Sequence, residues 1–397
     1  MLLALTGAFS LSQAYRTVAA IMAPQLQADF GLSAQALGIF AGSFHFAFGG
    51  MQLFAGIGID LHGVRRTVLA AFPLAIAGSV LSALATSYGV LVFAQVLIGL
   101  GCAPTFLVCT VFIARHFPSA RFAVVSGLVL SLGGVGMLIT GTPLAWLVEA
   151  SSWRAGYWVL TGCAALAWLG ILWLVHEPEL ASTQRSGESV LGAVRGFGAL
   201  FTLPHTLGIL ALAAVTYASF ISLRGLWLGP MLIQRHGFSL VESGNVAIAM
   251  SIAAMVGSPL LGRLDPGERT RRHWIVGFSL GVAALFALLA FNPGAAFDVA
   301  GAIVFGVVSG FIVLQYSDVR TAYPAALIGR AMAVFTMAMF LGVALMQWLT
   351  GLVASMANAH GVDPFMAVLG TIAALLVAGT LAFALLPVPK RQAEAEH

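Results

Sequence analysis

The stretch GIGIDLHGVRR, residues 56–66, is a short polar segment between two apolar runs at 37–59 and 67–85. Such interruptions recur along a chain of 397 residues that is 8% charged and 60% hydrophobic. A soluble domain is about 25% charged. Charges this scarce, grouped between apolar runs of about 20 residues, predict a polytopic membrane protein and exclude a soluble globule.

Twelve apolar segments are long enough to cross a bilayer as helices. We expect them near residues 2–24, 37–59, 67–85, 88–113, 122–147, 156–175, 206–229, 243–262, 274–292, 297–316, 329–354 and 364–387. The predicted fold class is an all-α membrane protein with twelve transmembrane helices. The sequence has no Gly-Lys-Ser/Thr nucleotide loop and no His-Glu-x-x-His motif, so we expect no cofactor, no metal and no enzyme activity.

Basic residues are distributed unequally between alternate connections. Fourteen of the 18 Lys and Arg residues lie in every second connection or in the C-terminal tail, and only Arg154 and Arg235 lie in the other connections. The positive-inside rule then places both termini in the cytoplasm, and we expect a cell inner membrane. The net charge of +4 reflects these loops, so no nucleic-acid partner is expected.

The two halves of the chain resemble each other at an offset of 206 residues. The matching positions are Pro24, Gly31, Ser33 and Gly38 with Pro230, Gly237, Ser239 and Gly244. We expect a six-helix bundle at 1–175, a cytoplasmic linker at 176–205 and a second bundle with a short tail at 206–397. Within the linker, 189–203 fits either a helix on the membrane surface or plain chain. Two such repeats are a transporter architecture with a binding site between them.

The 56–66 stretch resembles the signature loop after the second helix of the major facilitator superfamily. The matching residues are Gly56, Asp60, Gly63 and Arg65. Leu61 and Val64 replace arginines that are usual in the family, and a degenerate copy of the loop begins at Gly262. The resemblance covers essentially the whole chain. It implies twelve helices in two six-helix repeats and a secondary transporter that works by alternating access.

The resemblance also implies a gating role for Asp60 and Arg65, in which a charged contact at the cytoplasmic end holds one access state. The alternative is that these residues only set topology and fold the loop. In span four, Gln95 stands where proton-linked members often carry Arg, and Thr142 interrupts a Gly-Pro pair typical of drug–proton antiporters. Both departures weaken the prediction of a multidrug exporter.

Arg16 and Arg224 lie inside spans one and seven, at nearly equivalent positions of the repeat, where charge is costly. The resemblance implies that these spans line the central cavity and that the two guanidinium groups face each other. Because no carboxylate lies deep in a span, we expect them to bind an organic or inorganic anion. The alternatives are bonds to backbone carbonyls or pairing with an outer acid, Asp29 or Glu242.

Four further polar residues belong to the predicted site. Gln13 shares a helix face with Arg16, Tyr217 shares one with Arg224, and Gln315 lies toward the inner end of span ten. Each is a candidate for orienting a ligand, or else an interhelical hydrogen-bond partner. His45 is the only histidine deep within a predicted span and is the candidate for carrying a coupling proton. The alternative for His45 is a packed side chain bonded to backbone.

Together these features predict a monomeric secondary transporter that moves a small anionic solute across the inner membrane, with a proton as the candidate ion for symport. Two alternatives stay open. One is an efflux transporter for apolar compounds, which the apolar spans permit and the two arginines disfavour. The other is a non-transporting membrane sensor on the same scaffold, which we would expect to carry a soluble domain or a longer tail.

Overall fold

The computed structural model describes residues 1–397 except 118, 177–197, 199, 325–326 and 388–397. The side chains of some helical residues, Asp60 among them, also lie outside the description. In the part of the chain that is described, all regular structure is helical, as the composition predicts. Most of the surface helix considered for 189–203 falls outside the described residues, since 189–197 and 199 are not described.

The first half of the chain contributes seven of the described helices. They are α1 (Leu2–Phe30), α2 (Ala34–Ala83), α3 (Tyr88–Cys102), α4 (Thr105–His116), α5 (Ser119–Ile139), α6 (Thr142–Ala150) and α7 (Trp153–Leu174). Helices α3 and α4 together form one span, and α5 and α6 form the next.

The second half contributes the remaining described helices. They are α9 (Thr206–Ser222), the π-helix η2 (Leu223–Trp227), α10 (Leu228–His236), α11 (Leu240–Arg263), α12 (Arg271–Ala290), α13 (Ala295–Ser309), α14 (Ile312–Ala322), α15 (Ile328–Ala359) and α16 (Pro364–Leu385). Helices α9, η2 and α10 follow one another as a single span, and α13 and α14 form another.

Ten segments of the described chain are long and apolar enough to cross a membrane. Helix α1 and residues 34–60 of α2 supply the first two spans, which gives the twelve predicted. The predicted connection at 60–66 is a sharp kink within α2, where the second span passes into the third at Gly63. The helix turns at Gly63, whose φ of 82° and ψ of 171° suit glycine alone.

The repeat seen in the sequence has a structural counterpart where the first span of each half ends. Gly31 and Gly237 both adopt the left-handed conformation that closes a helix, with φ of 61° and 69°. Ser33 and Ser239 then accept hydrogen bonds from the first turns of α2 and α11. The same two residue types therefore build the same tight connection in each half.

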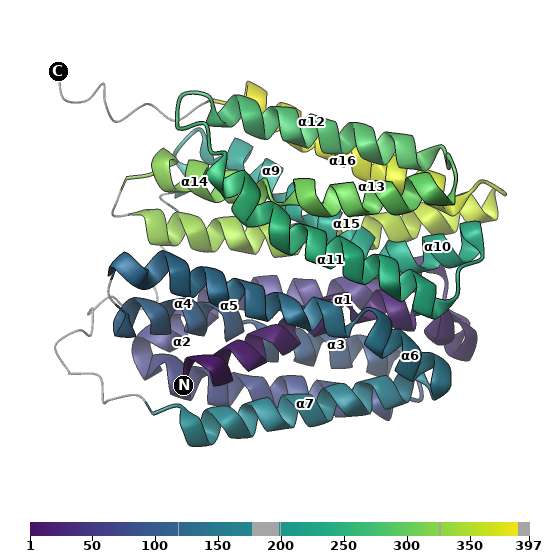
Figure 1. The fold of residues 1–397 in the computed structure, drawn as a ribbon, viewed down its shortest axis with the longest axis horizontal. Coiled ribbons are helices and arrows are strands. Elements are labelled where there is room, and N and C mark those ends of the chain that lie inside the picture. Colours follow the sequence, from purple (N-terminus) through teal and green to yellow (C-terminus); the bar gives the residue numbers. More distant parts are fainter. Residues whose placement is uncertain (118, 177–197, 199, 325–326, 388–397) are drawn as a thin grey trace.

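Figure 1 shows α1–α7 and α9–α16 as two groups of roughly parallel helices stacked on each other. Between the groups, α2 packs on α15, α5 and α6 pack on α11, and α1 crosses η2 and α10. Large apolar side chains such as Phe54, Trp146 and Leu166 stay exposed on the bundle surface. Such a surface suits lipid tails, which are as apolar as these side chains.

We name the two ends of the bundle by their connections. The basic end, at the left of Figure 1, holds the described connection 264–270 and basic residues such as Arg65 and Arg320. The opposite end holds the connections 31–33, 237–239 and 360–363.

Two seams of small residues join the halves toward the opposite end. In the α2–α15 seam, Gly38 lies against the Gln347 carbonyl, and a Cβ on Gly351 would lie 2.8 Å from the carbonyl oxygen of Ala34. In the α6–α11 seam, the hydroxyl of Thr142 donates to the side-chain oxygen of Asn245 at 2.5 Å. Small residues let the backbones approach this closely. The backbones of the two halves are therefore in close contact at this end.

Candidate functional site

The two predicted arginines, Arg16 and Arg224, lie where α1 crosses η2. A Cβ on Gly225 would lie 3.0 Å from the carbonyl oxygen of Arg16, and one on Gly229 would lie 2.7 Å from that of Ala20. Glycine at these two positions lets the helices touch backbone to backbone. The π-helix η2 contains Gly225 and is itself part of this crossing. Such irregular turns are frequent at functional sites.

Arg16 is a buried cation with neutral neighbours, and only 6% of its surface is exposed. Its Nη1 donates to the Tyr217 hydroxyl at 3.3 Å and its Nη2 to the Ser12 hydroxyl at 3.4 Å. The guanidinium carbon also lies 4.5 Å from the ring centroid of Phe48 and 4.7 Å from that of Phe340. Its Nε is buried without a hydrogen-bond partner. Arg16 therefore keeps hydrogen-bonding capacity.

Arg224 is fully buried and is held by carbonyl and hydroxyl oxygens. Its Nε donates to the Ala247 carbonyl at 3.0 Å and to the Ser251 hydroxyl at 2.9 Å. Its Nη2 donates to the Met137 carbonyl at 2.7 Å, across the boundary between the halves. The side chain thus points toward α11 and α5. The hydrogen-bond and ring partners of Arg16 lie instead on α1, α2, α9 and α15. The expectation that the two guanidinium groups face each other is not met.

The outer acids considered as partners for these arginines are engaged elsewhere. Asp29 accepts a hydrogen bond from Arg154 at 3.1 Å. Glu242 caps the first turn of α11, where its side chain accepts the Ser239 N–H at 2.8 Å. Within the described residues, no carboxylate oxygen lies within 4.0 Å of a side-chain nitrogen of Arg16 or Arg224. Both are buried cations without an anionic partner in that part of the chain.

The three other predicted ligand-orienting residues differ in position. Tyr217 accepts the Arg16 hydrogen bond, and its ring meets Phe340 edge-on at 5.4 Å. Gln13 has a buried side-chain oxygen without a partner. Gln315 accepts from the Thr216 hydroxyl at 3.1 Å, and its Nε2 is unpartnered. The structure thus brings Tyr217 directly onto Arg16 and leaves Gln13 and Gln315 with free hydrogen-bonding atoms.

His45 lies on the face of α2 that packs on α15. Its Nδ1 bonds the Ala41 carbonyl at 3.1 Å, and its ring stacks near Phe340 at 6.4 Å. Its side chain interacts with the fully buried Gln347 beside it, although neither Nε2 of His45 nor the amide atoms of Gln347 have a hydrogen-bond partner within 3.5 Å among the described residues. Sequence reasoning missed Gln347. The signal that was available is a polar residue deep within the apolar span 329–354.

The described contacts of Arg65 and Gly56 in the 56–66 stretch lie within the first half. Arg65 Nη2 donates to the Leu172 carbonyl at 2.9 Å, in the last turn of α7. Gly63 makes the turn in α2, whereas Gly56 has ordinary spacing from its neighbour Leu107. The side chain of Asp60 lies outside the described residues. The described contact of Arg65 fixes the loop on its own bundle, and a gating contact between halves is still a prediction.

In the second half, the carboxylate of Asp265 holds the equivalent loop through hydrogen bonds. Asp265 accepts hydrogen bonds from Arg271 Nε at 3.0 Å and from the Gly267 N–H at 3.0 Å. Partial burial raises the pKa of this carboxyl, but these bonds outweigh burial and lower it. Nearby, Arg272 binds both oxygens of Asp318 at 3.2 Å. Two ion pairs thus fasten the basic end of the second bundle.

The two arginines of the opposite end also bind within their own halves. Arg154 pairs with Asp29 and ties α7 to α1. Arg235 pairs with Asp363 at 2.6 Å and ties α10 to α16, next to a His236–Asp298 contact of 2.8 Å. Because none of these pairs crosses between the halves, they are able to persist when the halves separate.

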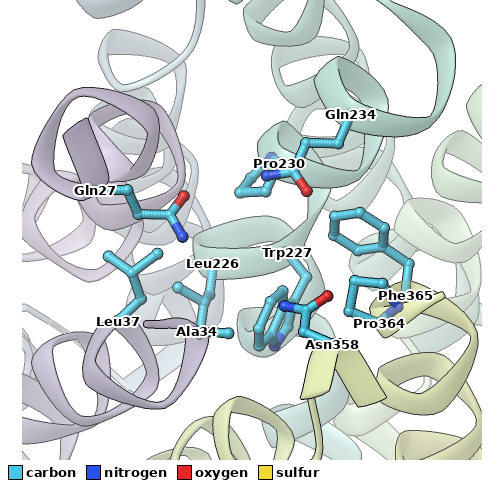
Figure 2. A pocket seen from close by; sticks show the side chains of 10 residues that line it. All are labelled: Gln27, Ala34, Leu37, Leu226, Trp227, Pro230, Gln234, Asn358, Pro364 and Phe365. Carbon is cyan, nitrogen blue, oxygen red and sulfur yellow. The ribbon is translucent and has the colours of Figure 1, made fainter. Parts of the chain in front are cut away.

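A small pocket lies at the opposite end of the interface (Figure 2). Gln27 and Leu37 line it from the first half, and Trp227, Asn358 and Phe365 line it from the second. Its volume of about 30 Å³ is too small for an organic solute and holds about two water molecules at most. The pocket marks the closed end of the interface and is separate from the crossing at Arg16.

Twelve spanning helices in two repeated halves, with buried cations at their crossing, define a membrane transporter of the two-repeat type. The sequence profile described as Major Facilitator Superfamily matches residues 4–346. The chain belongs to this family.

Two relatives of this chain are described as transporters of hexuronate and of galactarate or D-glucarate. The hexuronate transporter of Bacillus subtilis (strain 168) is 24% identical over 61% of this chain and 58% of its own length. A probable galactarate/D-glucarate transporter of the same strain is 25% identical over 64% of this chain and 61% of its own. The chain thus spans about three-fifths of the length of these relatives. A solved D-xylose-proton symporter, 16% identical, matches 98% of both chains with a TM-score of 0.75, which shows the fold alone.

Proposed function

We propose that this protein is a secondary transporter for a small organic anion bearing a carboxylate, and that its two halves alternate access to the site at Arg16. The observation that carries the proposal is the environment of Arg16. Its guanidinium is buried between the halves, makes two long hydrogen bonds to neutral hydroxyls and keeps an unpartnered Nε. A carboxylate would satisfy such a fork bidentately.

The neutral groups around Arg16 suit the remainder of a hydroxylated anion. Gln13, His45, Gln347 and Gln315 each have a buried polar atom without a partner. Buried polar atoms are almost always hydrogen-bonded in proteins, so these call for a ligand or water. The names of the two Bacillus relatives refer to sugar acids, which combine a carboxylate with several hydroxyl groups. The free hydrogen-bonding atoms near a guanidinium match a solute with one carboxylate and several hydroxyl groups, which supports a sugar acid as the solute.

An apolar cargo fits this site poorly. It would desolvate the guanidinium of Arg16 without supplying an acceptor, and an unsatisfied buried charged group costs several kcal/mol. Efflux of apolar compounds is therefore the weaker proposal. We also propose that Arg224, which already has three acceptors, contributes positive potential to the site more than direct contacts.

We assign the basic end to the cytoplasm of a cell inner membrane by the positive-inside rule. On this assignment, both termini are cytoplasmic and the seams at the opposite end close the outer side. The 56–66 loop, with Gly56, Asp60, Gly63 and Arg65, is then the proposed cytoplasmic gate, and the protein acts as a monomer. His45, in the α2–α15 seam, is the proposed carrier of a coupling proton.

The proposal is tested by ligand-dependent thermal shift and by uptake into proteoliposomes. The panel contains D-glucuronate and D-glucarate as carboxylates, D-xylose as a neutral sugar and tetraphenylphosphonium as an apolar cation. We expect the carboxylates alone to stabilise the purified protein. Arg16→Gln should reduce uptake about 10- to 100-fold, the range for losing a hydrogen-bonded charge.

Arg154→Gln is the matched control, because it removes an arginine that pairs with Asp29 away from the site. It should leave carboxylate uptake within about 3-fold of the unmodified protein, since exposed ion pairs contribute little. Stabilisation by tetraphenylphosphonium alone, or unchanged carboxylate affinity in Arg16→Gln, would overturn the proposal.

A further inference from the structure

Two phenylalanines from different halves of the molecule meet at the guanidinium of Arg16. Phe48 belongs to α2, and Phe340 belongs to α15. Their ring centroids lie 4.3 Å apart with the ring planes inclined at 49°. The guanidinium carbon lies 4.5 Å from the first centroid and 4.7 Å from the second. These three distances form a nearly equilateral triangle, so both rings lie on one side of the cation.

This arrangement leaves the rest of the guanidinium available. Tyr217 and Ser12 take one hydrogen bond each, at 3.3 and 3.4 Å. The faces of aromatic rings attract a cation without accepting its N–H groups in the plane. The rings can therefore fix the position of Arg16 while its planar fork stays free for an oxyanion.

The contact depends on close approach of the two halves. Gly49 follows Phe48, and a Cβ there would lie 3.1 Å from the Phe340 Cβ and 3.2 Å from the Leu341 nitrogen. A larger residue at 49 would push α15 away from α2. Because the rings come from different halves, Phe340 leaves Arg16 whenever the α2–α15 seam opens.

We propose that Phe48 and Phe340 form an aromatic cleft that positions Arg16 for the anion, and that this cleft is complete only while the opposite end is closed. The inference rests on the proposed anion function. It adds two positioning residues and a dependence of anion affinity on the access state. A preorganised guanidinium binds more tightly because it has lost its side-chain freedom before the ligand arrives.

The first test measures D-glucuronate uptake by Phe48→Leu and Phe340→Leu, which keep apolar volume but lose the ring. A cation–π contact of about 0.5–2 kcal/mol corresponds to a rise in KM of about 2- to 30-fold, with a smaller change in kcat. Phe48→Tyr and Phe340→Tyr keep the ring face and should restore the KM to within about 2-fold. Arg16→Gln is measured alongside.

The second test needs no substrate. Phenylglyoxal modifies accessible guanidinium groups, and peptide mass spectrometry reports the rate at Arg16 and Arg224 separately. We expect Phe340→Leu and Phe48→Leu to raise the Arg16 rate several-fold and to leave the Arg224 rate unchanged. A parallel rise at Arg224 would indicate general loosening and overturn the proposal.

Three outcomes separate this inference from the proposed function. A large effect of Arg16→Gln with unchanged KM in both Leu variants overturns the aromatic cleft and leaves the anion function standing. No effect of Arg16→Gln on uptake overturns the anion function, and the cleft with it as a device for anion binding. An Arg16 modification rate that does not respond to either Leu substitution shows that the rings do not position the guanidinium.

Discussion

Arg16 and Arg224 occupy nearly equivalent positions in the two repeats but have opposite surroundings. Arg224 is fully buried, with short bonds to two backbone carbonyls and one hydroxyl. Arg16 lies against two aromatic rings and makes only two long bonds to hydroxyls. Each arginine has one buried nitrogen without a partner, Nε in Arg16 and Nη1 in Arg224, so the two differ in how short their other bonds are. The shorter bonds of Arg224 hold structure together, whereas the long bonds of Arg16 are more easily exchanged for a ligand. Equivalence in a repeat therefore does not imply equivalent roles.

The bond from Arg224 to Met137 adds a second distinction, because at 2.7 Å it is a short hydrogen bond from one half to the other. The contact of Arg16 with the other half is a 3.3 Å bond to a phenol and a ring face. We infer that Arg224 stabilises the state closed at the opposite end and that Arg16 binds the solute.

The largest expected effect is that of Arg224→Met on the equilibrium between the states that are closed and open at the opposite end. This variant tests whether Arg224 and Arg16 differ in role. Losing a charged hydrogen bond between the halves should favour opening by about 10- to 100-fold. The measurement is the labelling rate of Ser355→Cys by a membrane-impermeant maleimide, in a variant whose three native cysteines are replaced. Ser355 lies in the α2–α15 seam, where it accepts the Gln35 N–H at 2.9 Å.

Arg16→Met in the same reporter is the comparison and should accelerate labelling less than Arg224→Met does, since its contacts across the interface are a 3.3 Å bond to Tyr217 and the ring of Phe340. Equal acceleration by both substitutions would mean that the two arginines act alike, and the distinction drawn from their partners would be wrong.

The next largest effect is expected on the pH dependence of uptake, through His45. If this imidazole carries the coupling proton, uptake of D-glucuronate should be several-fold faster at pH 5.5 than at pH 7.5, and His45→Gln should bring that ratio close to 1. His360→Gln is the control, because His360 is exposed at the opposite end and its described side-chain hydrogen bond is to the Met356 carbonyl. A ratio that survives in His45→Gln would indicate a facilitator without this proton.

The charge pattern was sufficient to predict twelve spans, because each basic connection constrains the two spans beside it. The surroundings of Arg16 could not be predicted in the same way. The sequence does not indicate which helix a Phe in an apolar span faces, and the whole chain contains 27 Phe residues. The contact of Phe48 with Phe340 depends on the packing of the halves. The partners of Arg224 are equally invisible, since every residue has a carbonyl.

A smaller effect is expected when Arg224 loses only one acceptor. Ser251→Ala removes the hydroxyl that accepts from Nε at 2.9 Å, while the Ala247 carbonyl continues to accept at 3.0 Å. A neutral acceptor is worth about 1 kcal/mol, so labelling of the seam reporter should rise about 2- to 5-fold. Ser12→Ala, beside Arg16, removes a 3.4 Å bond and should leave labelling nearly unchanged.

The smallest effect is expected at the basic end, where the two halves fold their equivalent loops differently. Arg65 binds a helix carbonyl, whereas Asp265 binds Arg271 and the Gly267 N–H. Because the bonds to Asp265 lower its pKa, they stabilise the folded protein at neutral pH. This contribution is lost as pH falls below the ordinary carboxyl value of about 4 and through the lower folded value.

Asp265→Asn should therefore lower thermal stability at pH 7 by less than about 1 kcal/mol, as is usual for partly exposed pairs. The difference from the unmodified protein should disappear at acidic pH, where the native carboxyl is also protonated. Thr67→Val is the comparison in the first half. Its hydroxyl donates to the Gly63 carbonyl at 2.7 Å, and this acceptor does not titrate. Its stability loss should be the same at both pH values, and a loss that faded in acid would contradict the prediction.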